Sequence, residues 1–241
     1  MGIVTTLKVS VGVEWAQRFH PGACNQTDLS WTADQAQGFY NHMGANGHTQ
    51  IFNWGDDNAW ETDFTHPAFG GDSLNWSDNV DFCFFDSHGG NNGTRLNLTF
   101  AIAHNNCRSF STQWRLGAKK LKWIAFAGCQ SVLNSNASHI IGVWGGPMKG
   151  VHVVCGYIGD STDSWWSNDL GEDFADDVST RATIVGAWLD RAYSFWLNDD
   201  AIAIAAGATQ DEAINRREHE TLDFRDTVVS ATNWLAWKTR T

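Results

Sequence analysis

Two apolar runs, each ending in a reactive residue, constrain the fold of this chain most strongly. The first run, VDFCFFDSHGG, reaches His88 and Gly89, and the second, LKWIAFAGCQS, reaches Cys129. Four or more consecutive apolar residues bounded by turn residues are typical of strands buried on both faces of a parallel sheet. Such strands deliver their last residues to one edge of the sheet, where open α/β folds bind ligands. The runs therefore predict an imidazole and a thiol at the same edge, the arrangement of a histidine-activated thiolate.

Further strands and helices alternate along the chain. We expect strands at residues 9–15, 150–156 and 228–237, a short strand or buried turn at 201–206, and helices at 33–40, 176–196 and 209–219. Ser30 or Thr32 is the expected cap of the first helix, and Thr209, with Glu212 at the capping-box position, that of the last. The interleaving predicts a single α/β domain over residues 1–241, with a mainly parallel sheet flanked by helices.

Two stretches lack a clear pattern. Residues 52–71 are rich in Trp, Asp, Asn and Gly and indicate a long surface loop. The polar stretch around Trp114 is expected to hold a helix. Neither stretch interrupts the apolar runs, so both are expected to lie outside the central sheet.

Composition excludes several classes of function. The formal net charge of −11 disfavours binding to nucleic acids or anionic membranes. No apolar stretch approaches the roughly 18 residues of a membrane-spanning helix. The first residues lack the pattern of a signal peptide, so we expect a cytoplasmic protein. The five cysteines show no zinc-like spacing, and we expect reduced thiols, no metal site and no cofactor. The sequence does not indicate an oligomeric state.

The two apolar runs together resemble a known family. An apolar block ending in His-Gly, followed by one ending in a small residue and Cys, is typical of the caspase-like cysteine peptidases, which include caspases, metacaspases, legumains, gingipains and separases. Positions 88 and 129 are 41 residues apart, a separation of the size found in those enzymes, and the order of His before Cys also agrees. The resemblance covers residues 80–131 by motif and 9–220 by element order. It implies a caspase-like three-layer sandwich.

The resemblance also implies roles for individual residues. Cys129 would be the nucleophile that forms a thioester, and His88 the general base and acid. The backbone N–H groups of Gly89 and Cys129 would form the oxyanion hole. Asp86, two residues before His88, is expected on the same strand face and could tune the imidazole or contact substrate. The chain departs from the family at Ala127, where many relatives carry an acidic residue, and in the Gln-Ser turn after the cysteine.

Candidate substrate contacts follow the strand at residues 150–156, where the family forms a wall of the pocket for the residue before the cut. These candidates are Asp160, Asp163, Trp165 and Trp166. Acidic side chains there would favour a basic substrate residue. The alternative is that most of the 14 tryptophans pack the core and fasten long loops.

Three functions are compatible with these residues. The first is a cysteine peptidase, or a transpeptidase that resolves the thioester with an amine. The second is a non-proteolytic Cys-His enzyme that acts on a small molecule in a biosynthetic pathway. The third is an aromatic-rich binding module with a vestigial dyad. A serine nucleophile is disfavoured because the chain contains no GxSxG elbow.

Overall fold

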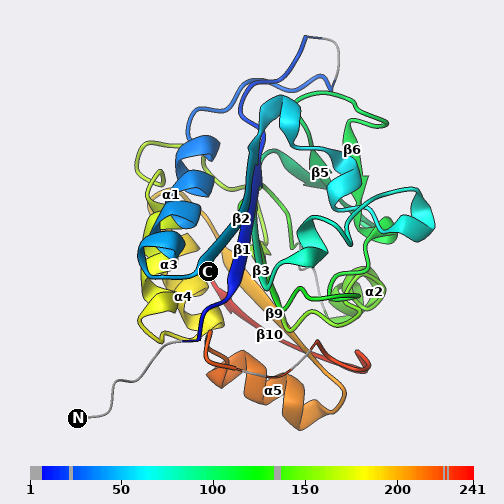
Figure 1. The fold of residues 1–241 in the computed structure, drawn as a ribbon, viewed down its shortest axis with the longest axis vertical. Coiled ribbons are helices and arrows are strands. Elements are labelled where there is room, and N and C mark those ends of the chain that lie inside the picture. Colours follow the sequence, from blue (N-terminus) through cyan, green and yellow to red (C-terminus); the bar gives the residue numbers. More distant parts are fainter. Residues whose placement is uncertain (1–6, 22–23, 133–136, 225, 227) are drawn as a thin grey trace.

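The structure, a computed structural model, describes residues 7–21, 24–132, 137–224, 226 and 228–241. In these ranges the chain builds one large sheet, whose strands run in the order β2-β1-β3-β7-β8-β9-β10 (Figure 1). Its strands are β1 (Ser10–Trp15), β2 (Thr49–Gly55), β3 (Phe82–Asp86), β7 (Trp123–Phe126), β8 (Val153–Tyr157), β9 (Ala201–Gly207) and β10 (Trp234–Arg240). The strands from β2 to β8 pair in parallel, whereas β9 is antiparallel to both of its neighbours. The predicted mainly parallel sheet is confirmed.

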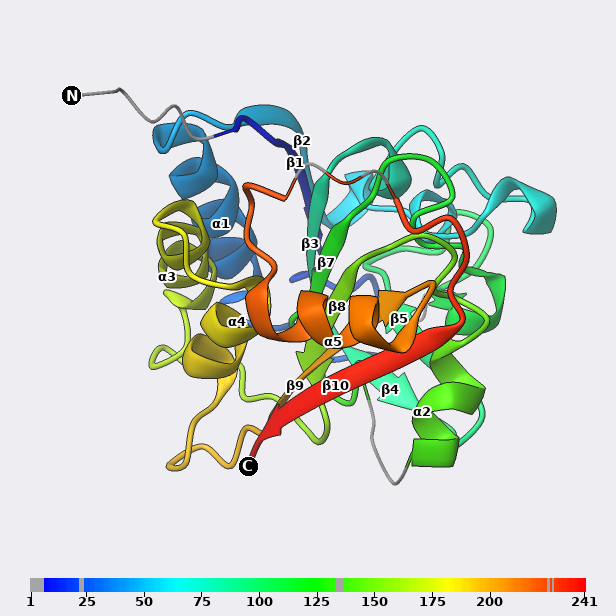
Figure 2. The ribbon, with the colours of Figure 1, turned by 90° about the horizontal axis from the view of Figure 1, so that it is seen from below.

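Helices and a second sheet cover the large sheet. On one face lie α1 (Thr32–Ala45), α3 (Leu170–Ser179) and α4 (Ile184–Ala192) (Figures 1 and 2). On the other lie α2 (Ala137–Trp144) and a small antiparallel sheet of β4 (Gly89–Asn91), β5 (Leu96–Thr99) and β6 (Arg108–Phe110). The helix α5 (Gln210–His219) packs along β9 and β10 (Figure 2). The sheet is therefore covered on both faces, as its apolar strands predict.

The strand β3 shows why the apolar runs are continuous. Phe82 and Phe84 belong to the core beneath α1 and α3, whereas Cys83 and Phe85 belong to the core on the opposite face. All four side chains are fully buried. Successive side chains of a strand point to opposite faces, so a strand between two cores must be apolar at every position.

Four predicted elements differ in the structure. The strand predicted at 228–237 is β10, which begins only at Trp234 and extends to Arg240. Residues 52–55 are the end of β2 and not a loop, because their backbone pairs with β1. The stretch around Trp114 holds no α-helix but one short 3-10 helix, Ser111–Gln113, after the small sheet. The indole N–H of Trp114, which is fully buried, donates to Ser109 Oγ at 2.8 Å. The predicted helix at 176–196 is two helices, α3 and α4, and Arg181 between them has a left-handed φ of 74°.

Helix capping was predicted at both ends of the chain, with opposite results. Thr209 caps α5 as expected, accepting from Glu212 N–H at 3.2 Å. Neither Ser30 nor Thr32 caps α1 through its side chain. Instead, the side-chain oxygen of Gln17 accepts from Ala33 N–H at 3.0 Å. The Asp163 carboxylate accepts from the N–H groups of residues 30 and 31, just before the helix, at 2.6 and 2.9 Å. Residues far away in the sequence accept these bonds, which local patterns cannot show.

The expectation that all thiols are reduced is wrong for one pair. Cys24, in the loop after β1, forms a disulfide with Cys107, just before β6, and their Cα atoms lie 5.3 Å apart. Their 83-residue separation left the pairing invisible in the sequence. Cys83, Cys129 and Cys155 are free. Disulfides persist mainly in oxidising compartments, so this pair weighs against the predicted cytoplasmic location.

The described ranges contain no helix that is long and apolar enough to cross a membrane. In the same ranges, no group of three or more His, Cys, Asp or Glu side chains is arranged to hold a metal ion.

Candidate active site

The strands β3 and β7 bring His88 and Cys129 to one cleft. They are neighbours in the sheet and pair in parallel up to Phe85 and Phe126. Beyond these residues, the backbone after each strand extends past the carboxyl edge of the sheet for a few residues. His88 and Cys129 then line the same cleft, whose volume is about 30 Å³. The other lining residues include Asp86 and Ala127, at the ends of the two strands.

Two glycines let the backbones beyond β3 and β7 touch. A Cβ on Gly89 would lie 2.3 Å from the carbonyl oxygen of Cys129, and a Cβ on Gly128 would lie 2.3 Å from that of Ser87. Real Cβ atoms do not approach this closely, so only glycine fits at either position. The glycines next to the two reactive residues therefore have a packing reason as well as any catalytic one.

Ser161 holds the sulfur of Cys129. Its backbone N–H donates to Sγ at 3.4 Å, and its Oγ lies 3.7 Å from Sγ and 3.1 Å from the Ala127 carbonyl oxygen. The next residue after the cysteine, Gln130, has a left-handed φ of 50°, and its N–H donates to the Gly159 carbonyl at 2.6 Å. The turn that carries the half-buried thiol is thus fastened to the segment after β8.

The ring of His88 is oriented by a backbone carbonyl. Its Nε2 lies 2.9 Å from the Thr27 carbonyl oxygen, which can only accept, so Nε2 carries the proton in this contact. The other ring nitrogen, Nδ1, makes no hydrogen bond to the part of the chain that the structure describes. Phe19 packs against the imidazole, with ring centroids 5.1 Å apart. The imidazole and the Cys129 thiol share the cleft without a direct hydrogen bond between them.

Two backbone N–H groups at the cleft are free for a ligand. That of Cys129 has no acceptor among the described residues. In the small sheet, Gly89 pairs with Leu98, and Thr99 N–H donates to the His88 carbonyl at 2.9 Å. This bond makes Gly89 a non-hydrogen-bonded position of the ladder, so its N–H points away from β5. These are the two groups that the resemblance assigns to the oxyanion hole.

Asp86 is a buried carboxyl group in the cleft. It is 3% exposed, and no hydrogen bond to its side chain is made by any described residue. Burial, and secondarily the charge of Asp163, raises its pKa well above the ordinary value. Gln35 also lines the cleft, and its buried Oε1 has no hydrogen-bond partner in the described structure. The cleft therefore contains acceptors that the protein itself leaves unused.

Comparison with known protein families gives a match that covers nearly the whole chain. A family model described as a domain of unknown function, DUF6345, matches residues 13–237. The chain belongs to this family. A search of the curated proteins found no match. The DUF6345 match contains His88 and Cys129, and its description assigns no activity, so functional inference rests on the site itself.

The remaining candidate contacts of this DUF6345 domain are divided between two places. Asp163 lines the cleft, although its carboxylate already accepts from the two N–H groups just before α1. Asp160 lies outside the cleft and accepts from Gln130 Nε2 at 3.0 Å. Trp165 and Trp166 also lie outside the cleft, with 57% and 70% of their surface exposed. The segment after β8 turns away from the cleft beyond residue 163, which separates these side chains from Cys129.

Two residues that contact His88 and Cys129 in the DUF6345 domain were missed in the sequence. Ser161 carried a usable signal, because it belongs to a polar run directly after the buried strand β8, next to β7 in the sheet. Thr27 carried none, because its contribution is a backbone carbonyl in a loop. Main-chain contacts of this kind do not depend on residue type.

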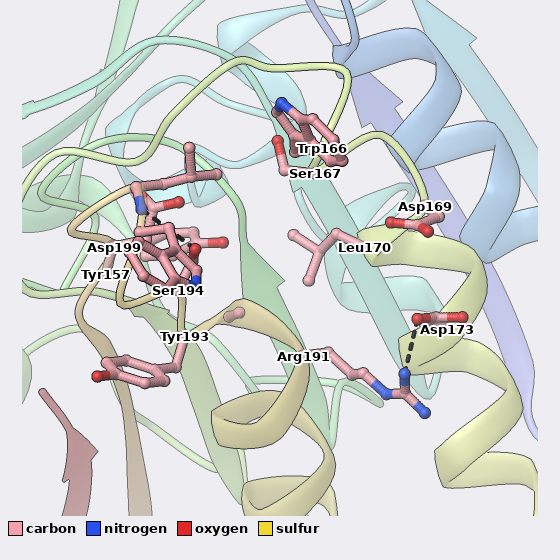
Figure 3. A pocket seen from close by; sticks show the side chains of 13 residues that line it. Tyr157, Trp166, Ser167, Asp169, Leu170, Asp173, Arg191, Tyr193, Ser194 and Asp199 are labelled. Carbon is pink, nitrogen blue, oxygen red and sulfur yellow. Dashed lines mark hydrogen bonds and ion pairs between the residues drawn. The ribbon is translucent and has the colours of Figure 1, made fainter.

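A larger pocket of the DUF6345 domain lies on the other side of the segment after β8. Its volume is about 560 Å³, and Trp166 is one of its walls. Figure 3 shows Tyr157, Ser194 and Asp199 on one side of this pocket, and Leu170 and Asp169 on the other. Thr162 connects the two places, because it lines the cleft and donates from Oγ1 to Asp199 at 2.9 Å.

Proposed function

We propose that this chain is a caspase-like cysteine hydrolase in which His88 and Cys129 form the catalytic dyad. The observation that carries the proposal is that both side chains line one cleft, at the carboxyl edges of the neighbouring parallel strands β3 and β7. The three-layer arrangement around a mainly parallel sheet is compatible with the caspase-like fold. The favoured substrate is a peptide.

In the proposed reaction, Nδ1 of His88 takes the proton of the Cys129 thiol, directly or after a small rotation of either side chain. The sulfur attacks the carbonyl carbon of the scissile bond, and a C–S bond forms. The C–N bond then breaks, and the proton on the imidazole passes to the leaving amine. The resulting thioester is hydrolysed by water, or is resolved by an amine in a transpeptidation.

The surroundings of the dyad suit these steps. The Thr27 carbonyl holds Nε2–H, and so leaves the lone pair of the neutral imidazole on Nδ1. The N–H groups of Gly89 and Cys129, which meet no acceptor among the described residues, would stabilise the oxyanion of the tetrahedral intermediate. The N–H of Ser161 points at the sulfur, where negative charge develops.

The substrate group that enters the cleft is proposed to be positively charged. Asp86 is a buried carboxyl without a hydrogen-bond partner, and an ammonium group would supply both charge and donors. A volume of about 30 Å³ holds only one or two water-sized groups. It therefore suits the compact head of a lysine side chain better than a planar guanidinium.

The same small volume supports a second candidate, a Cys-His enzyme that acts on a small molecule and not on a peptide. A long peptide needs a groove on both sides of the nucleophile, whereas a cleft of this small volume suits a compact acyl donor. Both candidates use the same thioester chemistry, so they differ in substrate and not in mechanism.

The thiol chemistry is tested by alkylation with iodoacetamide across a range of pH. We expect Cys129 to react much faster than the buried thiols of Cys83 and Cys155. His88→Ala should slow the reaction by about tenfold or more, because it removes the base. His219→Ala, at the exposed end of α5, is the matched control and should leave the rate unchanged.

Equal, slow labelling of the three free thiols, or an unchanged rate in His88→Ala, would remove both enzymatic candidates and leave a binding module. If Cys129 is reactive, fluorogenic peptides that differ in the residue before the cut decide between the candidates. Cleavage after lysine supports the peptidase. A reactive thiol that cleaves none of the peptides supports the small-molecule enzyme.

A further inference from the structure

The large pocket beside the cleft has a rigid wall that presents aromatic side chains to solvent. Residues 194 and 199 exchange two backbone hydrogen bonds, of 3.1 and 3.0 Å, which close a short hairpin. At its tip, Phe195 and Trp196 are 72% and 90% exposed, and Trp196 lines the pocket. Trp166 lies on the opposite rim and is also largely exposed. Fixed, exposed aromatic groups around one hollow are typical of a binding site.

The charges in this pocket are mainly negative. Asp169, Asp173 and Asp199 line it, and Arg191 is its one cationic lining residue. Arg191 is already engaged, because it bonds to Asp173 at 2.7 Å, as Figure 3 shows, and to Asp177 at 2.6 Å. The carboxylates therefore outnumber the cationic groups that could serve a ligand.

One of these carboxylates is not used by the fold. Asp169 occupies the N-cap position of α3, but its side chain makes no capping bond. No other hydrogen bond or ion pair to it occurs within the described structure. Asp199, in contrast, is buried at the base of the hairpin and is held by Thr162 at 2.9 Å. One acceptor is thus exposed at the rim, and the other lies deep in the pocket.

From this combination, we infer that the pocket binds an organic cation that has an apolar or aromatic body and a protonated amine. The body would lie against the walls formed by Leu170, Tyr193 and Trp196, and the ammonium group would bond to Asp169 or Asp199. A volume of about 560 Å³ falls in the range of sites for small ligands.

This inference does not depend on the dyad, and its test uses the intact chain with phenylbutylamine as the probe. Calorimetry and tryptophan fluorescence would compare it with phenylbutanol and phenylbutyrate, which share its apolar body. We expect the amine to bind about tenfold or more tightly than the alcohol, and the carboxylate to bind most weakly. Asp169→Asn and Trp196→Ala, both at exposed side chains, should each weaken amine binding at least threefold.

Trp234→Ala is the matched control, because Trp234 is 48% exposed on the edge strand β10 and does not line the pocket. This variant should bind the amine as the parent chain does. The inference is overturned if phenylbutylamine does not bind, if the three probes bind equally, or if the two pocket variants behave like the control. Alkylation of Cys129 is measured in a separate experiment. Failure of the amine to bind therefore leaves the proposed thiol chemistry untouched, and an unreactive Cys129 leaves the binding result untouched.

Discussion

Buried carboxyl groups lie at both ends of the central strands, and the two ends differ in the partners that these groups have. At the amino end, the carboxylate of Glu220 is fully buried and accepts from the indole N–H of Trp123 at 2.7 Å. It also pairs with His152 and with Arg216. At the carboxyl end, Asp86 is almost as deeply buried and has no partner within the described ranges. Glu220 thus lies against cationic and donor groups, whereas Asp86 at the other end of the strands has no charged partner in the described structure.

The difference separates a region held by internal ion pairs from the region of the candidate site. Burying a charged group without a partner costs several kcal/mol, so such a group persists where it serves something other than stability. The amino-end cluster of Trp123, His152, Arg216 and Glu220 ties the start of β7 and β8 to α5. The carboxyl end leaves its acceptors open beside a thiol and an imidazole.

The largest expected effect comes from breaking the paired end. Glu220→Ala leaves the buried Arg216 and His152 without their shared carboxylate, and should lower the free energy of unfolding by about 3–5 kcal/mol. Chemical denaturation measures this loss. The control is Glu218→Ala on the same helix, whose ion pairs with Arg217 and Lys238 are partly exposed and should contribute less than about 1 kcal/mol. Similar losses in both variants would show that the cluster is not a structural anchor.

A smaller loss is expected when the disulfide at the carboxyl end is removed. The pair Cys24→Ser and Cys107→Ser opens a link between residues 83 positions apart, and should cost about 2–4 kcal/mol. The loop that contains Cys24 also carries the Thr27 carbonyl, so Cys129 should become less reactive towards iodoacetamide. Treating the parent chain with a phosphine reductant is the control, since it should reproduce both effects. Unchanged reactivity would mean that His88 is oriented without this loop.

The third effect concerns the backbone contact at the carboxyl end. Gly89→Ala places a Cβ against the carbonyl oxygen of Cys129, and should cost about 1–3 kcal/mol while displacing the thiol. Thermal unfolding and alkylation kinetics measure the two consequences. Gly142→Ala is the matched control: a Cβ there meets no atom within 4 Å, and in the helix α2 it should add up to about 1 kcal/mol of stability. A Gly89→Ala variant as stable and reactive as its parent would show that the two loops can separate freely.

The sequence revealed the strands of the functional end better than it revealed the loops around them. The strands β3 and β7 were predictable because a strand between two cores is apolar throughout, and their last residues follow at fixed positions. The small sheet was not, because its short strands carry polar residues such as Asn91 and Asn97 that resemble a loop.

Contacts between distant segments were the other failure. The bonds that Asp163 accepts from the residues just before α1, and the link between Cys24 and Cys107, join residues that no local pattern relates. The position of Thr27 opposite His88 depends on a main-chain atom, which every residue type possesses. The shared edge of His88 and Cys129 was therefore visible in the sequence, whereas the groups that orient the two side chains required the fold.

The smallest effect, and the one that most sharpens the comparison, comes from Asp86→Asn. Its carboxyl has a pKa raised by burial, so the folded state binds a proton more tightly than the unfolded chain does. Stability from this group is therefore greatest at low pH, and falls as the pH rises above the ordinary aspartate value near 4. Asn has a similar shape and no charge, so the variant should gain about 1–2 kcal/mol over its parent at neutral pH and lose that advantage in acid.

Denaturation of both proteins across the pH range measures this gain. The difference between the two curves isolates Asp86, because other buried carboxyls such as Asp63, whose pKa burial raises to about 7, contribute equally to each. A destabilised variant at neutral pH would mean that the carboxylate is compensated after all, and that the two ends of the sheet are alike. A stabilised variant that also loses its preference for a cationic substrate group would show that the Asp86 carboxyl lowers stability and serves substrate binding.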